Sequence, residues 1–208
     1  MNRSCCFLFF LLFSFFSCSQ GPSPSISHHR DGRKKPAIIL PQVKLSVPSL
    51  ELVWNVREEL TEQLKIMWQE RNLFYLLPKV EGEADYQQAN WFAKRPSFPS
   101  QEGFLILIEL LQHTGLPRPS PPSPLQEISV YCRVRVVDLR GKENRLLLQE
   151  IFHQTHPLSD RGLKVDYTQW GWGSDHYWKT PLYKVHKKLC KQVVQRVEKY
   201  ILLAQGIS

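Results

Sequence analysis

The 208-residue sequence contains no familiar catalytic signature. It lacks an HExxH pair for zinc hydrolysis, a glycine-rich loop that could hold a phosphate, and a nucleophile elbow. His153 and His156 lie three residues apart, with Asp175 and His176 further along. Zinc needs three or four ligands, and His153 is expected on a strand but His156 in a loop, so we do not expect them to share a metal. We therefore expect a protein that is not an enzyme and that uses no metal or cofactor.

Neither of the two most apolar stretches is long enough to cross a membrane. Residues 7–16 are phenylalanine and leucine except for Ser14, and residues 104–111 contain one charge, Glu109. A membrane-spanning helix needs about 20 apolar residues. The first stretch follows Arg3 and is typical of the hydrophobic region of a secretory signal peptide. The second stretch predicts a central strand.

The end of the signal resembles a bacterial lipobox, because the small residue Ser17 is followed by Cys18. Lipoprotein processing would remove residues 1–17 and acylate Cys18 with chains such as palmitate, and two or three chains suffice for stable anchoring. The usual pattern has an aliphatic and then a small residue where this chain has Phe15 and Phe16. Simple cleavage and an uncleaved anchor are the alternatives. Ser19 is not the aspartate associated with retention at the inner membrane, so we expect the outer membrane, with the protein facing the periplasm.

The mature chain divides by composition into a tether and a domain. Residues 18–35 are rich in serine and proline and then in histidine and basic side chains, which is typical of a flexible segment. The apolar fraction of 42% indicates a folded body, which we place at residues 36–208. The formal charge of +8 suggests nucleic acid or an anionic membrane or polymer as partner. Export argues against nucleic acid, and a solvated basic surface without a specific partner is the alternative.

Hydrophobic periodicity predicts an α/β (α+β) domain with one mixed sheet of about five strands and two long helices. Ser49 is expected to cap the first helix. Thr180, followed by Pro181, is expected to cap the last helix, and that helix should end near Gly206. Acidic and basic side chains are expected on the exposed face of the first helix, namely Glu58, Glu59, Glu62, Lys65 and Arg71. In order, we expect a strand at 37–40, a helix at 49–72, a strand at 73–77, a short helix at 83–93, strands at 104–111, 128–136 and 146–152, and a helix from 181.

The clearest alternation lies in residues 128–136. It predicts a hairpin strand with apolar residues facing the core and Arg133 and Arg135 facing solvent. Cys132 falls on the inner side of this strand, and Cys190 on the apolar side of the last helix. A disulfide between them is one expectation for an oxidising compartment, and two separately buried thiols are the other.

The order of motifs resembles a group of bacterial envelope proteins. The motifs are an AIILP strand at 37–41, an RNLFYLL junction at 71–77, an EADY segment at 83–86, a hairpin at 130–141 and a terminal amphipathic helix. Together they resemble envelope lipoproteins that share the fold of the TolB amino-terminal domain, the penicillin-binding-protein activator LpoB and the curli secretion lipoprotein CsgG. The phenylalanine-rich signal and residues 170–178 resemble chlamydial lipoproteins of uncharacterised function. The pore-forming segments of curli secretion proteins have no counterpart here, so the resemblance implies scaffolding or assembly.

An aromatic loop near the last helix is the best candidate for a functional surface. Trp170, Trp172, Tyr177 and Trp178 fall close together in the sequence. They either close over one end of the sheet or form an exposed contact patch, since tryptophan and tyrosine are strong interface anchors. We predict an envelope protein as the partner, with Arg133 and Arg135 adding attraction. The alternative is a periplasmic binding protein for an anionic lipid or glycan.

Overall fold

The computed structural model describes residues 35–46, 52, 54–77, 103–114, 127–157 and 165–206. The predicted signal peptide, residues 18–34 of the predicted tether, the helix cap at Ser49 and the short helix at 83–93 lie outside the described residues. Lys35, the last residue of that tether, belongs instead to the folded body, because its ammonium donates to Oδ1 of Asn72 at 2.6 Å. Among the described helices, none has the length and apolar character needed to cross a membrane.

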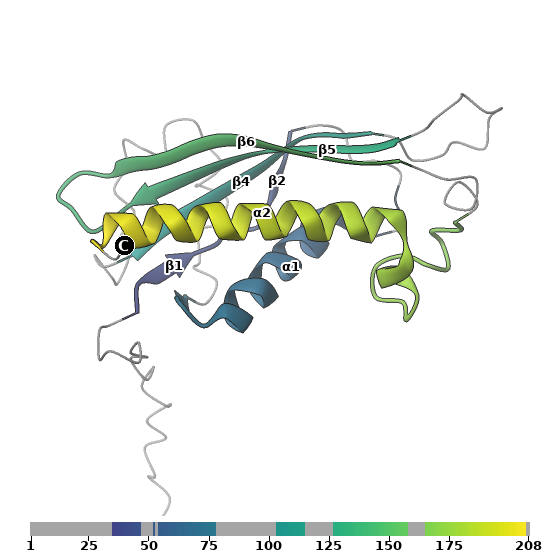
Figure 1. Cartoon of the computed structure of the whole chain (residues 1–208), viewed down its shortest axis with the longest axis horizontal. Coiled ribbons are helices and arrows are strands. Elements are labelled where there is room, and N and C mark those ends of the chain that lie inside the picture. Colours follow the sequence, from purple (N-terminus) through teal and green to yellow (C-terminus); the bar gives the residue numbers. More distant parts are fainter. Residues whose placement is uncertain are drawn as a thin grey trace, which may run out of the picture. The chain divides into compact units, whose positions relative to one another are not determined.

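The described strands form one mixed sheet, as predicted (Figure 1). Strand β1 pairs in parallel with β3 on one side and β4 on the other, while β4, β5 and β6 form an antiparallel meander. The short β2 also pairs in parallel with β4, further along β4 than the residues that pair with β1. The strands are β1 (Ala37–Ile39), β2 (Lys44–Leu45), β3 (Tyr75–Leu76), β4 (Gly103–Thr114), β5 (Glu127–Asp138) and β6 (Arg145–Pro157).

Strand β5 confirms the alternation read from the sequence. Its inward residues Ile128, Val130, Cys132, Val134 and Val136 are at most 2% exposed. Strands β4 and β6 continue further than expected, to Thr114 and Pro157, because each remains paired with β5 over most of its length. A one-residue slip would bury Arg133 and Arg135, so the register is strongly specified.

Helix α1 (Val56–Arg71) begins later than the sequence suggested. The side chain of Asn55 accepts a hydrogen bond from the backbone N–H of Arg57 at 3.1 Å and caps the helix. The helix ends at Asn72, which adopts the left-handed conformation with φ 53°. Helix α2 (Pro181–Ala204) begins and ends as expected, with the Thr180 side chain accepting from the N–H of Tyr183.

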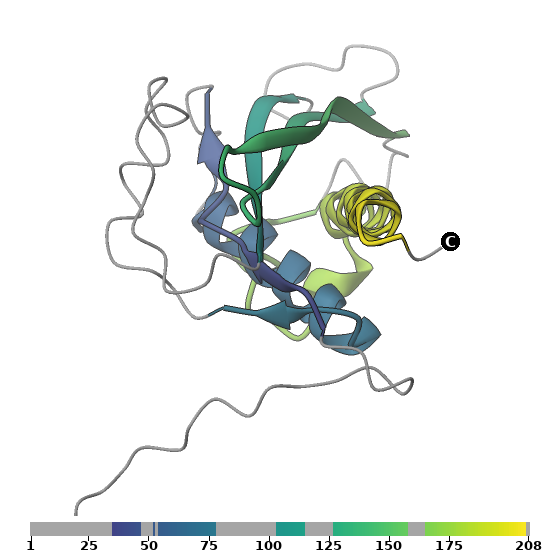
Figure 2. The same cartoon turned by 90° about the vertical axis from the view of Figure 1, so that its left-hand side faces the viewer.

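Both helices cover the same face of the sheet, so the described domain has two layers (Figure 2). The main core lies between this face and the helices. Its largest members are Trp68, Phe104, Ile38, Leu64, Ile106, Ile128, Leu182 and Ile201, all under 2% exposed. A smaller apolar cluster of Ile39, Leu105, Val137 and Leu139 lies on the opposite face.

Candidate functional site

Residues 165–180, which we call the aromatic segment, form a chain of turns that leads into η4 (Tyr177–Lys179) and helix α2. Asp166 starts the segment by accepting hydrogen bonds from the N–H and hydroxyl of Thr168. Gly173 has φ +93°, a conformation that favours glycine. These local devices turn the chain sharply without any strand or long helix.

Trp54 holds the aromatic segment against the start of helix α1. Its ring lies 6.1 Å from that of Tyr167 and 5.7 Å from that of Tyr177, between ring centres. A Cβ built on Gly171 would lie 2.7 Å from Cε3 of Trp54, so glycine is required for this close approach. The predicted loop therefore has a packed underside.

A buried carboxylate lies beneath this packing. Glu59 is 0% exposed and accepts hydrogen bonds from the hydroxyl of Tyr177, from Nε1 of Trp54 at 2.9 Å and from Nε2 of Gln63 at 2.8 Å. Nδ1 of His186 lies 2.6 Å from Oε1 of Glu59. Nε2 of His186 in turn lies 2.8 Å from Nε2 of His113. We call Trp54, Glu59, His113, Tyr177 and His186 the buried polar network.

Four elements, α1, β4, η4 and α2, supply this network together with Trp54, and a bulge in β4 makes it possible. The register of β4 against β5 shifts between Leu110 and Gln112, so that Leu111 is an extra residue. The shift turns His113 to the inner face, opposite Val130. There it is 6% exposed and meets His186 of helix α2.

The hydrogen bonds fix which nitrogen donates. Nδ1 of His113 is buried and has no partner among the described residues. Burying an unprotonated nitrogen without a partner costs less free energy than burying an N–H without an acceptor. We therefore place the His113 proton on Nε2, which donates it to Nε2 of His186. His186 then donates through Nδ1 to Glu59. His113 of β4 thus donates to His186 of α2, which donates to Glu59 of α1.

The network shifts the pKa values of Glu59, His113 and Tyr177. Burial raises the pKa of Glu59, but the interactions with His186, Tyr177 and Trp54 outweigh this and hold it below its usual value. Burial and the neighbouring His186 lower the pKa of His113 to about 2. Burial and the Glu59 carboxylate raise the pKa of Tyr177. Glu59, Tyr177 and His113 are 0%, 5% and 6% exposed, so the network lies in the core, where it can anchor the aromatic segment.

The outer side of the aromatic segment carries exposed tryptophans. Trp178 is 59% exposed, and Nζ of Lys179 lies 4.9 Å from its ring centre. Trp170 is 36% exposed and packs at 5.3 Å against His176. Trp172 is half-buried. The four aromatic residues singled out in the sequence therefore split into a buried anchor, Tyr177, and a surface formed by the tryptophans.

The two arginines of the predicted site lie elsewhere. Arg133 and Arg135 are on the outer face of the sheet, whereas the aromatic segment packs with the helices on the inner side. Glu109 of β4 forms ion pairs with them, at 3.0 Å to Arg133 and 3.9 Å to Arg135. Glu109 also accepts from the hydroxyl of Ser46, and its pKa stays below the usual value because these partners outweigh its partial burial. Part of the basic character expected of this face is thus neutralised locally.

The network was not recognised from the sequence, and one expectation about it was wrong. Glu59 was placed with the exposed charges of the first helix, but it is fully buried. The available signal was its position beside the apolar residues Val56 and Leu60, where a carboxylate must find buried donors. Nothing in the local pattern marked His113, since its orientation depends on the bulge.

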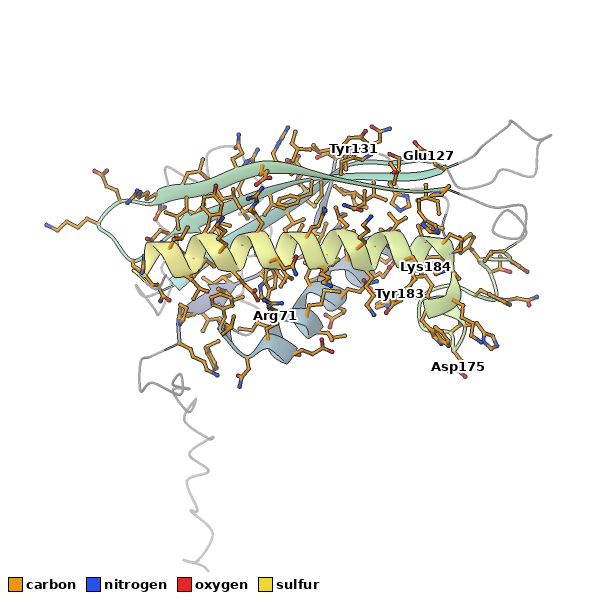
Figure 3. The ribbon with its side chains drawn as sticks, viewed as in Figure 1. Arg71, Glu127, Tyr131, Asp175, Tyr183 and Lys184 are labelled. Atoms are coloured by element: carbon orange, nitrogen blue, oxygen red, sulfur yellow. The ribbon has the colours of Figure 1, made fainter. Side chains whose placement is uncertain are left out.

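Cys132 and Cys190 are both free and buried in the structure. Burial raises the pKa of Cys132 to about 12, and burial followed by the proximity of Cys132 raises that of Cys190. The predicted bridge is not formed here and stays a prediction. His153 and His156 point to opposite faces of β6: the His153 ring stacks on that of Tyr131, with 3.9 Å between ring centres, and His156 lies near Lys184 of α2. Figure 3 shows Tyr131 on the sheet and Lys184 on α2.

A model of a family of unknown function, DUF7499, matches residues 25–205. The chain belongs to this family. No curated protein matches it.

Several solved structures are similar to this member of DUF7499. The hypothetical protein CT253 from Chlamydia trachomatis has a TM-score of 0.65 at 24% identity, over 80% of this chain and 98% of that one. Protein XCC0632 from Xanthomonas campestris has a TM-score of 0.50 at 6% identity, over 89% and 92%. Lipoprotein GNA1162 from Neisseria meningitidis has a TM-score of 0.41 at 13% identity, over 62% and 89%.

At these identities the first two likenesses show a shared fold. The predicted resemblance to a chlamydial protein is confirmed at that level. The more specific likeness to TolB, LpoB and CsgG stays a prediction.

Proposed function

We propose that this member of DUF7499 is a non-catalytic envelope lipoprotein that acts as an interaction or assembly module. In this proposal acylated Cys18 anchors the chain to the outer membrane, and the folded body faces the periplasm. The proposal for the anchor is supported by the sequence of residues 1–18. The proposal for the body is supported by the aromatic segment.

One observation carries the interaction role: exposed tryptophans stand on a rigid, buried base. Trp178 is 59% exposed, although its neighbour Tyr177 is 5% exposed and bound to Glu59. Large aromatic side chains on a preorganised backbone are strong interface anchors, because little conformational entropy is lost when they bind. A loop that merely closed the core would bury these rings.

The test is co-purification from native membranes after crosslinking. Replacing Trp170 and Trp178 by alanine should lose a stoichiometric protein partner and lower the melting temperature only slightly, because the Trp178 side chain is 59% exposed and that of Trp170 36%. The matched control is alanine at Ile66 and Leu203, which are 51% and 53% exposed elsewhere on the helices. A large fall in thermal stability in the tryptophan variant would show that these rings belong to the core. Equal partner loss in both variants would also contradict the proposal.

Anchoring has its own measurement. Mass spectrometry of the amino terminus from native membranes should find an acylated peptide that begins at Cys18. An unmodified terminus at or after Cys18 would leave the interaction role open to test but remove the membrane tether.

A second candidate function is binding of an anionic lipid or glycan. It is favoured by the ammonium of Lys179 over the Trp178 ring, and by a first turn of α2 that contains no acidic residue. Flotation with phosphatidylglycerol vesicles, compared with phosphatidylcholine vesicles at rising salt, tests it. Binding to the anionic vesicles that salt removes, without a protein partner in the crosslinking experiment, would favour this second function.

A further inference from the structure

Strand β6 is a long edge of the sheet. Within the part of the chain that the structure describes, it pairs with β5 alone, over Arg145–Pro157. At the other edge, β3 has two residues. A long edge presents unpaired backbone N–H and C=O groups along its free side, which can pair with another extended chain.

The features that usually protect an edge are missing from the middle of β6. Between residues 146 and 156 there is no lysine, arginine or proline, and the one acidic residue is Glu150. Arg196 of α2 binds that carboxylate at 3.0 Å. The bulge at Leu147 lies near the start of the strand, so the pairing from Leu148 onward is regular. Ile151 is 55% exposed on the outer face.

A basic row runs beside this edge. Lys184, Lys188, Gln192 and Arg196 are spaced by four residues and so share one side of helix α2. Arg196 contacts Glu150 of β6, and Lys184 and Lys188 lie close enough to His156 to lower its pKa, after the larger effect of burial. Figures 1 and 3 show α2 running along β6, with Lys184 near one end.

We propose that the free edge of β6 and this basic row bind an extended acidic segment of a partner protein, which adds to the sheet as a strand. Side chains of an added strand alternate between the two faces of the sheet. One set would point toward Lys184 and Lys188, where carboxylates are favoured. The other set would lie beside Ile151, where apolar residues are favoured. The partner segment is therefore one in which acidic and apolar residues alternate.

A second copy of this chain fits the edge less well. Two β6 strands paired about a two-fold axis would bring two basic rows onto the same face of one continuous sheet. Like charges at such a boundary repel, whereas an acidic strand is attracted. The site is separate from the aromatic segment and shares with the proposed function only the premise that the chain is an interaction module.

The experiment uses the full chain in detergent and a labelled, capped eight-residue peptide in which glutamate and valine alternate. Binding is followed by fluorescence anisotropy at low salt. Replacing Lys184 and Lys188 by glutamine should weaken binding by about tenfold or more, since two close charge pairs are lost. The matched control is Lys187→Gln, which should change affinity by less than about twofold, because its ammonium is turned away from the row and lies over the Tyr183 ring.

Three further measurements test whether the peptide binds as a strand. Ile151→Lys adds a protecting charge at an exposed edge position and should abolish binding while preserving the melting temperature. A peptide methylated on alternate backbone nitrogens, and one with the glutamates and valines in separate blocks, should both bind at least about tenfold more weakly. The lysine variants keep the test informative if Ile151→Lys unfolds.

Distinct results would overturn the proposal. If Lys187→Gln lost as much peptide affinity as the Lys184 and Lys188 variant, the binding would be general charge attraction. Unchanged binding of the methylated peptide would exclude strand addition. Self-association in sedimentation that Ile151→Lys abolishes would identify a second copy as the occupant. Trp178→Ala should leave peptide affinity unchanged; loss there but not with Ile151→Lys would move the acidic peptide to the aromatic segment.

Discussion

Removing one hydroxyl from the buried polar network should measurably destabilise the protein. In Tyr177→Phe the ring remains and can keep its packing against Trp54 at 5.7 Å and Tyr183 at 5.4 Å. What disappears is the hydrogen bond that the hydroxyl donates to Glu59, together with the 3.3 Å contact between the hydroxyl and Nδ1 of His186. The change is therefore confined to the polar contacts of one hydroxyl, of which the bond to the buried carboxylate is the shorter.

The size of the effect follows from what Glu59 keeps. A hydrogen bond to a charged group contributes about 1.5–3 kcal/mol to stability. Glu59 still receives bonds from His186, Gln63 and Trp54, so it is not left without partners. We therefore expect a loss of about 2 kcal/mol, or about 4–8 °C in Tm for a domain of this size.

Urea unfolding at pH 7, followed by tryptophan fluorescence and by circular dichroism, measures this loss. Tyr183→Phe is the matched control, because it removes a tyrosine hydroxyl from the same neighbourhood without touching Glu59, and it should cost less than about 0.5 kcal/mol. A change below about 0.5 kcal/mol for Tyr177→Phe would refute the anchoring role of the network. An equal loss in both variants would show that the effect is not specific to Glu59.

Further predictions concern protonation, packing and thiols. His113 takes up a proton below about pH 6.5 in the unfolded chain, but only near pH 2 in the folded chain. The free energy of unfolding should therefore fall as the pH is lowered from 7 to 4, by up to about 1.4 kcal/mol per pH unit. Urea unfolding at a series of pH values measures this dependence, which should be weaker in His113→Phe. In the same assay, Gly171→Ala should lower the free energy of unfolding by about 1–3 kcal/mol, because the added Cβ clashes with Trp54. An unchanged urea midpoint would contradict the close approach of Gly171 to Trp54. Cys132 and Cys190 should resist Ellman's reagent until urea unfolds the protein, and rapid native reaction would contradict their burial.

Periodic features of the fold could be predicted from the sequence. The apolar stripe of α2, with Leu182, Leu189 and Ile201 buried, follows from a spacing that a helix alone satisfies. The Thr180–Pro181 start is likewise a local signal, because the hydroxyl and the fixed proline backbone act within one turn. The inward set of β5 needed only the alternation of apolar and polar residues.

The candidate site could not be predicted in the same way. Its bonds join residues far apart in the chain, such as Glu59 and His186. The inward turn of His113 depends on one extra residue in β4, which shifts the pattern without a glycine or proline to mark it. The burial of Tyr177 beside the exposed Trp178 depends on a turn of η4 and not on composition.

The order of strands in the sheet has a consequence for how the chain folds. From β4 onward each strand pairs with the next one in sequence, so this part can form from nearby contacts. Strand β1 instead pairs with β3 and β4, and β4 is separated from it by more than 60 residues. Because contacts across a long loop form late, we expect the carboxyl-terminal half to assemble first and the amino-terminal βαβ unit to dock onto it. Strand β1 and helix α1, which are synthesised before the rest of the described domain, would then be among the last elements to reach their final place.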